Sequence, residues 1–299
     1  MKTLATFLAF LIAGCAPAQS TEGFLKINGT SLFVKSFGKG PPLLVIHGGP
    51  GLNHSYFLPH LEALATDFHV ILYDQRASGA SAIPGQDSLR MEFFVHDIDA
   101  IRNYFGYEKV NLLAHSWGAI LAMQYGLDFP QHVDRMILCN PVALSREFDG
   151  ITASNQKQRM TRADSVDRAS ILQSKAFKEG NASAMEKLMM MSFRHSFYDA
   201  KNLAKLGLGL QQQFTQASKA LYGGLGKDLA RYNYYDSLST MTFPLMVLYG
   251  EADVLPLRAV QRIEERNPAA RLVPFSKSGH FIFIEEPARF RKELVGFVK

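Results

Sequence analysis

The sequence has little cysteine, little tryptophan and no dense block of basic residues. Of its 299 residues two are cysteine and one is tryptophan, and the net charge is only +5. So few cysteines exclude a disulfide-stapled scaffold, and the fold must be stable through packing. Because no basic stripe is interleaved with aromatic residues, a nucleic-acid partner is not indicated. Hydrophobic residues make up 47% of the chain, which is ample for a globular core.

Residues 1–18 have the pattern of an export signal. Lys2 precedes a mostly apolar run at 3–13, which is too short to span a bilayer. Ile-Ala-Gly-Cys at 12–15 resembles a bacterial lipobox, in which cleavage precedes an acylated cysteine, and ordinary cleavage after Ala-Pro-Ala at 16–18 is the alternative. We favour the lipobox because Cys15 directly follows the apolar run. This predicts an exported protein that a lipid on Cys15 anchors to a membrane facing the periplasm or cell exterior, or a soluble exported protein after ordinary cleavage.

Short apolar runs alternate with amphipathic stretches in two parts of the chain, 24–144 and 240–299. Residues 24–37 predict a hairpin that turns at Asn28–Gly29. Further strands are predicted at 43–47, 69–74, 110–114, 136–139, 243–249 and 271–275, and helices at 55–65, 91–104, 117–128, 257–266 and 286–298. This order indicates an α/β fold with a mostly parallel central sheet flanked by helices.

The segment 145–239 interrupts that alternation. It is polar, it has no β-branched apolar run, and it carries three consecutive methionines at 189–191. A helical insertion in the middle of an α/β sheet is typical of a cap domain. The methionines either line an apolar pocket or simply pack the cap, and the sequence leaves both open.

Ser116 is the predicted nucleophile. It lies in Ala-His-Ser-Trp-Gly at 114–118, between a predicted strand and a predicted helix. A tight strand-to-helix turn exposes such a serine, and the small neighbours Ala114 and Gly118 let strand and helix approach closely. The N-terminus of the helix favours negative charge beside the hydroxyl.

Acyl transfer also needs two backbone N–H groups that bind the oxyanion. We expect them from Trp117, directly after the nucleophile, and from Gly49 in His-Gly-Gly-Pro-Gly at 47–51. A plain turn is the alternative for this glycine run. A phosphate loop is disfavoured because no Lys-Ser or Lys-Thr pair follows the glycines.

Asp253 and His280 complete a predicted Ser-Asp-His triad. Both follow predicted strands, in the chain order expected for this arrangement. We expect His280 to act as general base and acid and Asp253 to orient it. Glu251 and Asp149 are rival acids, and Asp253 is otherwise a helix N-cap.

Other residues near these motifs are expected to have structural roles. Asp74 and Arg76 are predicted to form an ion pair that braces the loops, and His47 and His115 to brace loops as well. Cys139 is expected to be a small buried hydrophobe. No cluster of His, Asp and Cys has metal-ligand spacing, so neither a metal nor a cofactor is predicted.

Taken together, the motifs resemble the α/β-hydrolase superfamily, and specifically its proline iminopeptidase (prolyl aminopeptidase) branch. The resemblance covers 24–145 and 243–299 and is carried by the sequences at 47–51, 74–79, 115–118, 250–253 and 279–281. It implies metal-free cleavage of an N-terminal residue, often proline, from short peptides. The chain departs from the family at Ala114 and Ala77, where glycine is usual, and it lacks the Trp-rich cap motifs near the acids that bind the substrate amine.

The sequence does not select the acids that would bind such an amine. The candidates in the cap are Glu147, Asp149, Glu179, Glu186, Asp199, Asp228 and Asp236. The predicted function is an acyl-enzyme serine hydrolase, first an aminopeptidase that releases proline or small residues. A carboxylesterase or lactonase is the alternative, because esters and amides share one triad. A non-catalytic ligand-binding protein on this scaffold is a third hypothesis. The presence of Ser, Asp and His in the chain order expected of a triad argues against it.

Overall fold

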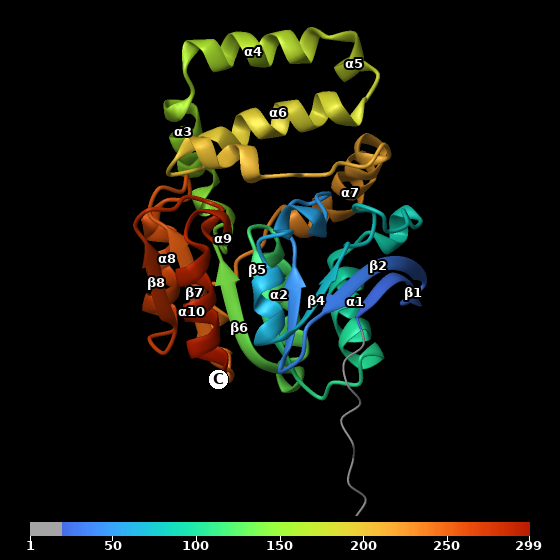
Figure 1. Cartoon of the computed structure of the whole chain (residues 1–299), viewed down its shortest axis with the longest axis vertical. Helices are drawn as coiled ribbons and strands as arrows, with labels where there is room; N and C mark the ends of the chain where they lie inside the picture. The colour runs from blue at the N-terminus through green and yellow to red at the C-terminus, as the bar shows by residue number, and fades with distance from the viewer. Residues whose placement is uncertain (1–19) are drawn as a thin grey trace, which may run out of the picture.

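The computed structural model describes residues 20–299, so the predicted export signal at 1–18 and Cys15 lie outside the described residues. The described chain forms an eight-stranded sheet with helices on both faces. A further layer of helices lies above the carboxyl ends of the central strands (Figure 1). The strand order is β1-β2-β4-β3-β5-β6-β7-β8. The strands are β1 (Thr21–Ile27), β2 (Thr30–Phe37), β3 (Pro42–Ile46), β4 (His69–Tyr73), β5 (Val110–His115), β6 (Val133–Cys139), β7 (Leu245–Gly250) and β8 (Arg271–Phe275).

The sheet is parallel from β4 to β8 and antiparallel at the edge formed by β1 and β2. The predicted hairpin is β1 and β2, and its turn holds Asn28 at a φ of 46°. Thr21 pairs with Ser36, and the neighbouring Phe37 pairs with Val70 at the start of β4. The chain therefore begins β1 at the end of the sheet where the parallel strands also start. The predicted α/β fold with a mostly parallel sheet is confirmed.

Helices cover both faces because alternate strand residues are buried on opposite sides. In β3, Leu44 and Ile46 belong to one apolar cluster, and Leu43 and Val45 belong to the other. The first cluster includes buried residues of α1 (Met91–Tyr104), α2 (Gly118–Asp128) and α8 (Leu257–Arg266), and the second those of α9 (Ile282–Glu285) and α10 (Pro287–Val298). In residues 20–299 no helix has the length and apolarity needed to cross a membrane.

One predicted helix is wrong. The segment 55–65 forms two 3-10 turns, η1 (His54–Phe57) and η2 (Glu62–Thr66). Pro59 lies between them, and proline lacks a backbone N–H and disfavours a helical conformation in the preceding residue. Three more short turns connect core elements: η3 (Gln86–Ser88), η4 (Pro130–His132) and η7 (Leu238–Thr240).

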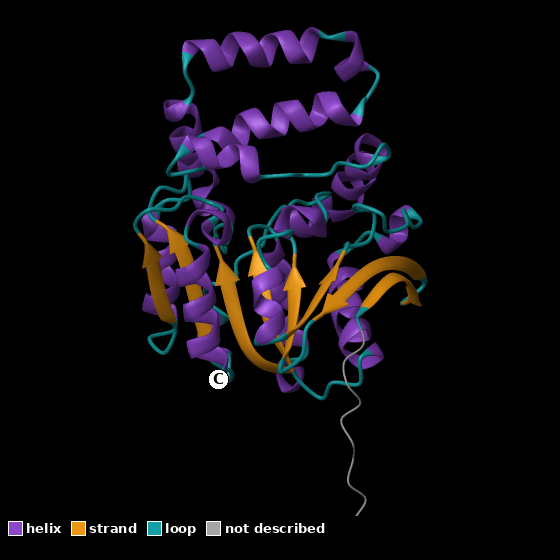
Figure 2. Cartoon of the chain, viewed as in Figure 1, coloured by secondary structure: helices purple, strands orange, loops and turns teal. Residues whose placement is uncertain are grey.

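The helical cap lies between β6 and β7. It consists of η5 (Arg146–Phe148), α3 (Asp149–Arg159), α4 (Arg162–Gln173), α5 (Lys175–Lys178), α6 (Ala182–Arg194), η6 (Ala200–Lys205) and α7 (Phe214–Leu229). Its two ends meet in an isolated antiparallel bridge between Ser145 and Asn233. Figure 2 shows the arrowheads of the central strands pointing at these helices, so the cap covers the carboxyl edge of the sheet.

Candidate active site

Ser116 occupies a strained turn between β5 and α2. Its φ is 54°, in the left-handed region that non-glycine residues rarely adopt. The Ser116 N–H donates to the Cys139 carbonyl, and its carbonyl accepts from the Val142 N–H, both at 3.2 Å. A side-chain carbon added to Gly118 would lie 2.5 Å from the Ile46 carbonyl oxygen, so glycine is required there. This is the tight strand-to-helix turn that the sequence predicts at Ser116, which is half-buried.

Asp253 and His280 are hydrogen-bonded to each other. The distance from Asp253 Oδ2 to His280 Nδ1 is 2.7 Å, and the same oxygen accepts from Asn140 Nδ2 at 2.9 Å. Asp253 Oδ1 accepts from the Val254 N–H at 2.6 Å. Burial alone would raise the pKa of Asp253, but the adjacent His280 and these hydrogen bonds lower it below its ordinary value. Asp253 is therefore an ionised carboxylate that is hydrogen-bonded to the imidazole.

Neither of the two rival acids is hydrogen-bonded to His280 within the described residues. Glu251 is exposed on the strand-end loop, and Asp149 forms an ion pair with Arg146 at 2.8 Å. The structure thus brings His280 to Asp253.

Two cavities meet at His280. The smaller, of about 140 Å³, is lined by Ser116 and His280 together with the apolar residues Leu52, Met189, Phe193 and Phe281. The larger, of about 580 Å³, contains His280, Trp117 and Asp149, and shares Gly49, Pro50 and Tyr222 with the smaller one. Within residues 20–299 the Ser116 hydroxyl has no hydrogen-bond partner. In structures without substrate, the hydrogen bond between a catalytic serine and its histidine base is often long, and it tightens only when substrate binds.

Gly49 and Trp117 present two unused backbone donors beside these cavities. In the described part of the chain neither N–H has an intramolecular acceptor. Gly49 has a φ of 129°, and a side-chain carbon there would lie 2.8 Å from the Gly51 nitrogen, so only glycine fits. The arrangement is consistent with the predicted pair of oxyanion donors.

A buried chain of hydrogen bonds supports the glycine loop. The Gly48 N–H donates to the Tyr56 hydroxyl at 2.6 Å, and that hydroxyl donates to His115 Nδ1 at 2.8 Å. His115 Nε2 then donates to the His280 carbonyl at 2.9 Å. Burial, together with the nearby His280, lowers the pKa of His115 to about 3. A neutral His115 therefore holds the His280 backbone and does not act as a second base.

Gln75 joins the glycine loop to the serine turn. Its side chain donates to the His47 carbonyl at 2.7 Å and accepts from Trp117 Nε1 at 3.1 Å. Its backbone N–H donates to His47 Nε2 at 3.0 Å, and burial lowers the pKa of His47 to about 4. The sequence placed Gln75 in a motif but gave no sign of this role, because Trp117 lies 42 residues away.

The predicted Asp74–Arg76 ion pair is wrong. Arg76 instead makes two hydrogen bonds, of 2.7 and 2.5 Å, to the buried Asp97 of α1. Asp74 accepts three hydrogen bonds from the His54 ring, the His54 N–H and the Ala80 N–H. Asp97 can present both carboxylate oxygens to the guanidinium, whereas those of Asp74 are already occupied.

Asp149 is the only one of the seven candidate cap acids that lines a cavity containing His280, among the described residues. The others have other surroundings: Glu147 pairs with Arg262, Glu179 with Lys175 and Asp236 with Arg266, Asp228 accepts from the Met91 N–H, Asp199 caps η6, and Glu186 lines a separate groove on the cap. In residues 20–299 no carboxylate lines the small cavity at Ser116.

Neither a metal cluster nor a reactive thiol accompanies this site in the described chain. No group of three or more His, Cys, Asp or Glu residues there is arranged to hold a metal ion. Cys139 is buried, and burial raises the pKa of its thiol. The thiol therefore stays protonated and unreactive.

Comparisons with known proteins agree with this geometry. The sequence profile of the α/β hydrolase fold matches residues 41–287. A proline iminopeptidase from Clostridioides difficile (strain 630) is 25% identical over 288 residues, which cover 92% of this chain and 96% of that protein.

Solved structures show the same fold. The proline iminopeptidase of Mycobacterium smegmatis has a TM-score of 0.70 at 22% identity and covers 93% of this chain and 97% of its own. The esterase EaEST from Exiguobacterium antarcticum has a TM-score of 0.70 at 20% identity and covers 93% of this chain and 99% of its own. The chain therefore belongs to the α/β-hydrolase fold family, within which it resembles the proline iminopeptidases.

Proposed function

We propose that the protein is a serine hydrolase that works through an acyl-enzyme. Ser116 attacks a carbonyl carbon while His280 takes its proton, and the Gly49 and Trp117 amides bind the resulting oxyanion. His280 then protonates the leaving group, and water releases the acyl group by the same route. The supporting observation is the Asp253–His280 hydrogen bond of 2.7 Å beside the cavity that Ser116 and His280 share.

The test is covalent labelling with a fluorophosphonate probe, together with hydrolysis of p-nitrophenyl acetate. We expect the wild-type protein to be labelled and Ser116→Ala to be neither labelled nor active, since loss of a triad member lowers turnover by about 10⁴-fold or more. Labelling of a folded Ser116→Ala variant at the wild-type rate would refute the assignment. A folded wild-type protein that resists the probe would favour the ligand-binding hypothesis.

For the substrate we propose short peptides that begin with proline or another small residue. The curated relatives named proline iminopeptidase support this choice. Asp149 supports it too, because its carboxylate lines the larger cavity next to His280 and is suited to bind a free amine. Arg146 lines the same cavity and competes for that carboxylate. The amine must therefore share Asp149 with Arg146 or displace it.

A carboxylesterase or lactonase activity is the second candidate. It is favoured by the apolar lining of the small cavity, where Met189, Phe193 and Phe281 surround the nucleophile. A kinetic panel of aminoacyl amides and uncharged short-chain esters separates the two. Higher kcat/KM on prolyl amides, abolished when the amine is acetylated, supports the aminopeptidase, whereas the reverse ranking supports the esterase.

We further propose that the protein is exported and carries a lipid on Cys15. The support is the order of Lys2, the apolar run at 3–13 and Cys15. Mass spectrometry of the mature N-terminus tests this: a diacylated or triacylated Cys15 is expected, and an unmodified N-terminus at Gln19 contradicts it.

A further inference from the structure

Arg159, the last residue of α3, connects the cap to the loop that carries Asp253. Its guanidinium donates to three carbonyl oxygens: those of Ala252 at 2.5 Å, Asp253 at 2.8 Å and His195 at 3.0 Å. A guanidinium has five N–H donors in a fixed plane, so it can bridge several carbonyls at once. Arg159 therefore links the loop after β7 to the segment that follows α6.

The cap segment that Arg159 contacts also holds the loop of His280. The Ser196 carbonyl accepts from the His280 N–H at 2.6 Å. A side-chain carbon added to the adjacent Gly279 would lie 2.1 Å from that same oxygen, so the two backbones are in direct contact. The loop of His280 thus rests on residues 195–196 of the cap.

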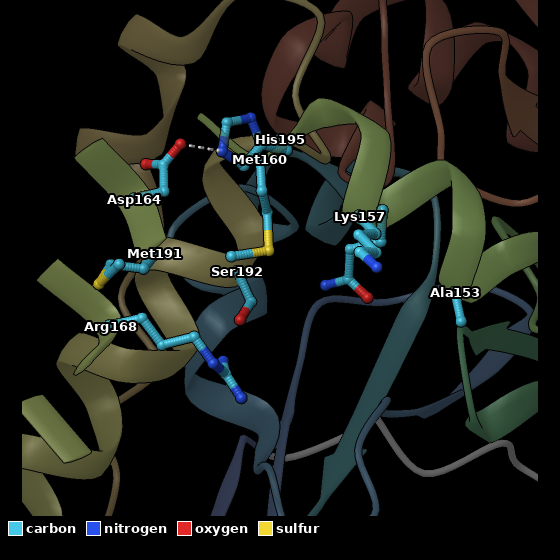
Figure 3. A pocket seen from close by; sticks show the side chains of 9 residues that line it. Ala153, Lys157, Met160, Asp164, Arg168, Met191, Ser192 and His195 are labelled. Atoms are coloured by element: carbon cyan, nitrogen blue, oxygen red, sulfur yellow. Dashed lines mark hydrogen bonds and ion pairs between the residues drawn. The ribbon is translucent and has the colours of Figure 1, made fainter. Parts of the chain in front are cut away.

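This segment is itself fixed inside the cap. The His195 ring is hydrogen-bonded at 2.9 Å to Asp164, which forms a capping box with Thr161 at the start of α4. Figure 3 shows this bond beside a cavity of about 260 Å³, where the end of α3, the start of α4 and the end of α6 meet. Asp164 is 3% exposed and accepts hydrogen bonds through both oxygens, so the junction is firmly held.

We propose that Arg159 is a positioning residue through which the cap holds the Asp253 loop and the His280 loop in register. The inference rests on the proposed roles of Asp253 and His280. Without the guanidinium, the carbonyls of 252, 253 and 195 lose their shared donor. The two loops also contact each other directly, because the Ala252 N–H donates to the Ser278 carbonyl at 3.0 Å and Asn140 donates to both Asp253 Oδ2 and the Gly279 carbonyl. Without the guanidinium these contacts alone set the spacing of the loops, and we expect the 2.7 Å contact between the Asp253 and His280 side chains to loosen.

Fold stability is expected to survive this change. Asn155 makes a second link from α3 to the same loop, because its side chain donates to the Val254 carbonyl at 2.9 Å. The Ser196–His280 hydrogen bond also remains. The effect of removing Arg159 therefore appears mainly in catalysis, where a misplacement of about 1 Å lowers turnover by up to about 100-fold.

The experiment compares Arg159→Gln, Arg159→Lys and the control Arg162→Gln on p-nitrophenyl acetate. Arg162 is an exposed cap arginine at the start of α4, and it makes no ion pair within residues 20–299. We expect Arg159→Gln to lower kcat by about 10- to 100-fold with KM nearly unchanged. Arg159→Lys should recover part of the loss because it keeps one charged donor, and Arg162→Gln should match the wild type.

A second readout does not depend on turnover. A proton held between His280 and Asp253 gives a low-field signal in the proton NMR spectrum, and we expect it to broaden or disappear in Arg159→Gln alone. If Arg159→Gln keeps the wild-type signal and kcat and only lowers the melting temperature, the positioning role is refuted. If the wild type itself hydrolyses no ester or amide, the proposed function fails, and the NMR comparison still decides whether Arg159 holds the pair.

Discussion

Replacing Asp253 by asparagine removes the negative charge beside His280 while keeping the size of the side chain. Asp253 Oδ2 accepts hydrogen bonds from both His280 and Asn140, at 2.7 and 2.9 Å. In Asp253→Asn an amide nitrogen takes the place of Oδ2 and donates a hydrogen bond to His280 Nδ1, which must accept it. His280 then carries its proton on Nε2 and cannot accept the Ser116 proton. Asn140 stabilises this state, because its Oδ1 is buried without a partner and can turn to accept from the new amide.

The expected loss follows from the wrong tautomer. A triad acid replaced in this way lowers kcat by about 10⁴-fold, which corresponds to about 5 kcal/mol of transition-state stabilisation. The opposite orientation of the amide is disfavoured, because its NH2 group would then face the Val254 N–H, another donor, which lies 2.6 Å from Asp253 Oδ1 in the wild type. Since all backbone contacts of the loop remain, the variant should fold.

The assay is kcat/KM on p-nitrophenyl acetate, with the rate of fluorophosphonate labelling as a second measure and thermal unfolding as the test of folding. Glu251→Gln is the matched control, because this exposed carboxylate lies two residues away on the same loop. It should keep wild-type activity. Our reasoning is refuted if folded Asp253→Asn stays within tenfold of the wild type, or if Glu251→Gln loses more activity than Asp253→Asn does.

Three further changes have defined outcomes. Gly118→Ala should lower stability by about 1–3 kcal/mol in urea unfolding, because the new carbon meets the Ile46 carbonyl oxygen at 2.5 Å, and an unchanged midpoint would contradict this. Arg76→Met leaves the buried Asp97 carboxyl without its cationic partner, so a loss of about 3–5 kcal/mol is expected and Arg76→Lys should lose less; equal losses would argue against the paired geometry. Asp149→Asn should raise KM for prolyl amides about tenfold but leave neutral esters unaffected, and an equal rise for both would remove Asp149 from amine binding.

Stability should also fall as the pH drops below about 6.5. Burial lowers the pKa of His47 to about 4 and that of His115 to about 3 from an ordinary 6.5, so the unfolded chain binds protons that the folded chain does not. Unfolding free energy then decreases towards acid, by at most about 1.4 kcal/mol per pH unit for each histidine. Urea unfolding from pH 7 to pH 4.5 measures this slope, and a flat profile would show that the two histidines do not stay neutral.

Local patterns explain why the strands and the serine turn were predictable. A buried parallel strand is a short apolar run, and a serine between such a run and a helix needs small neighbours for steric reasons alone. The hairpin at Asn28–Gly29 follows from the same kind of short-range rule. The signal against a helix at 55–65 was also local, since Pro59 lies inside the segment.

Partners across long sequence separations could not be derived in this way. Arg76 had a carboxylate two positions away at Asp74, yet it pairs with Asp97, which the sequence places 21 residues further on. His115 meets the His280 carbonyl across 165 residues. Which polar groups pair depends on how α1 and the loops pack against the sheet, and on which carboxylate oxygens remain free there. No spacing rule contains that information.

The antiparallel hairpin formed by β1 and β2 also determines where a membrane tether would join the described part of the chain. Thr21 begins β1 at the end of the sheet where the parallel strands start. Ser116 follows β5 at the opposite end of the strands, beneath the cap. A tether that precedes Thr21, such as the proposed lipid on Cys15, would therefore attach at the base of the molecule. The entrance to the catalytic cavities would face away from the bilayer, towards substrates that diffuse in solution and not towards the lipids themselves.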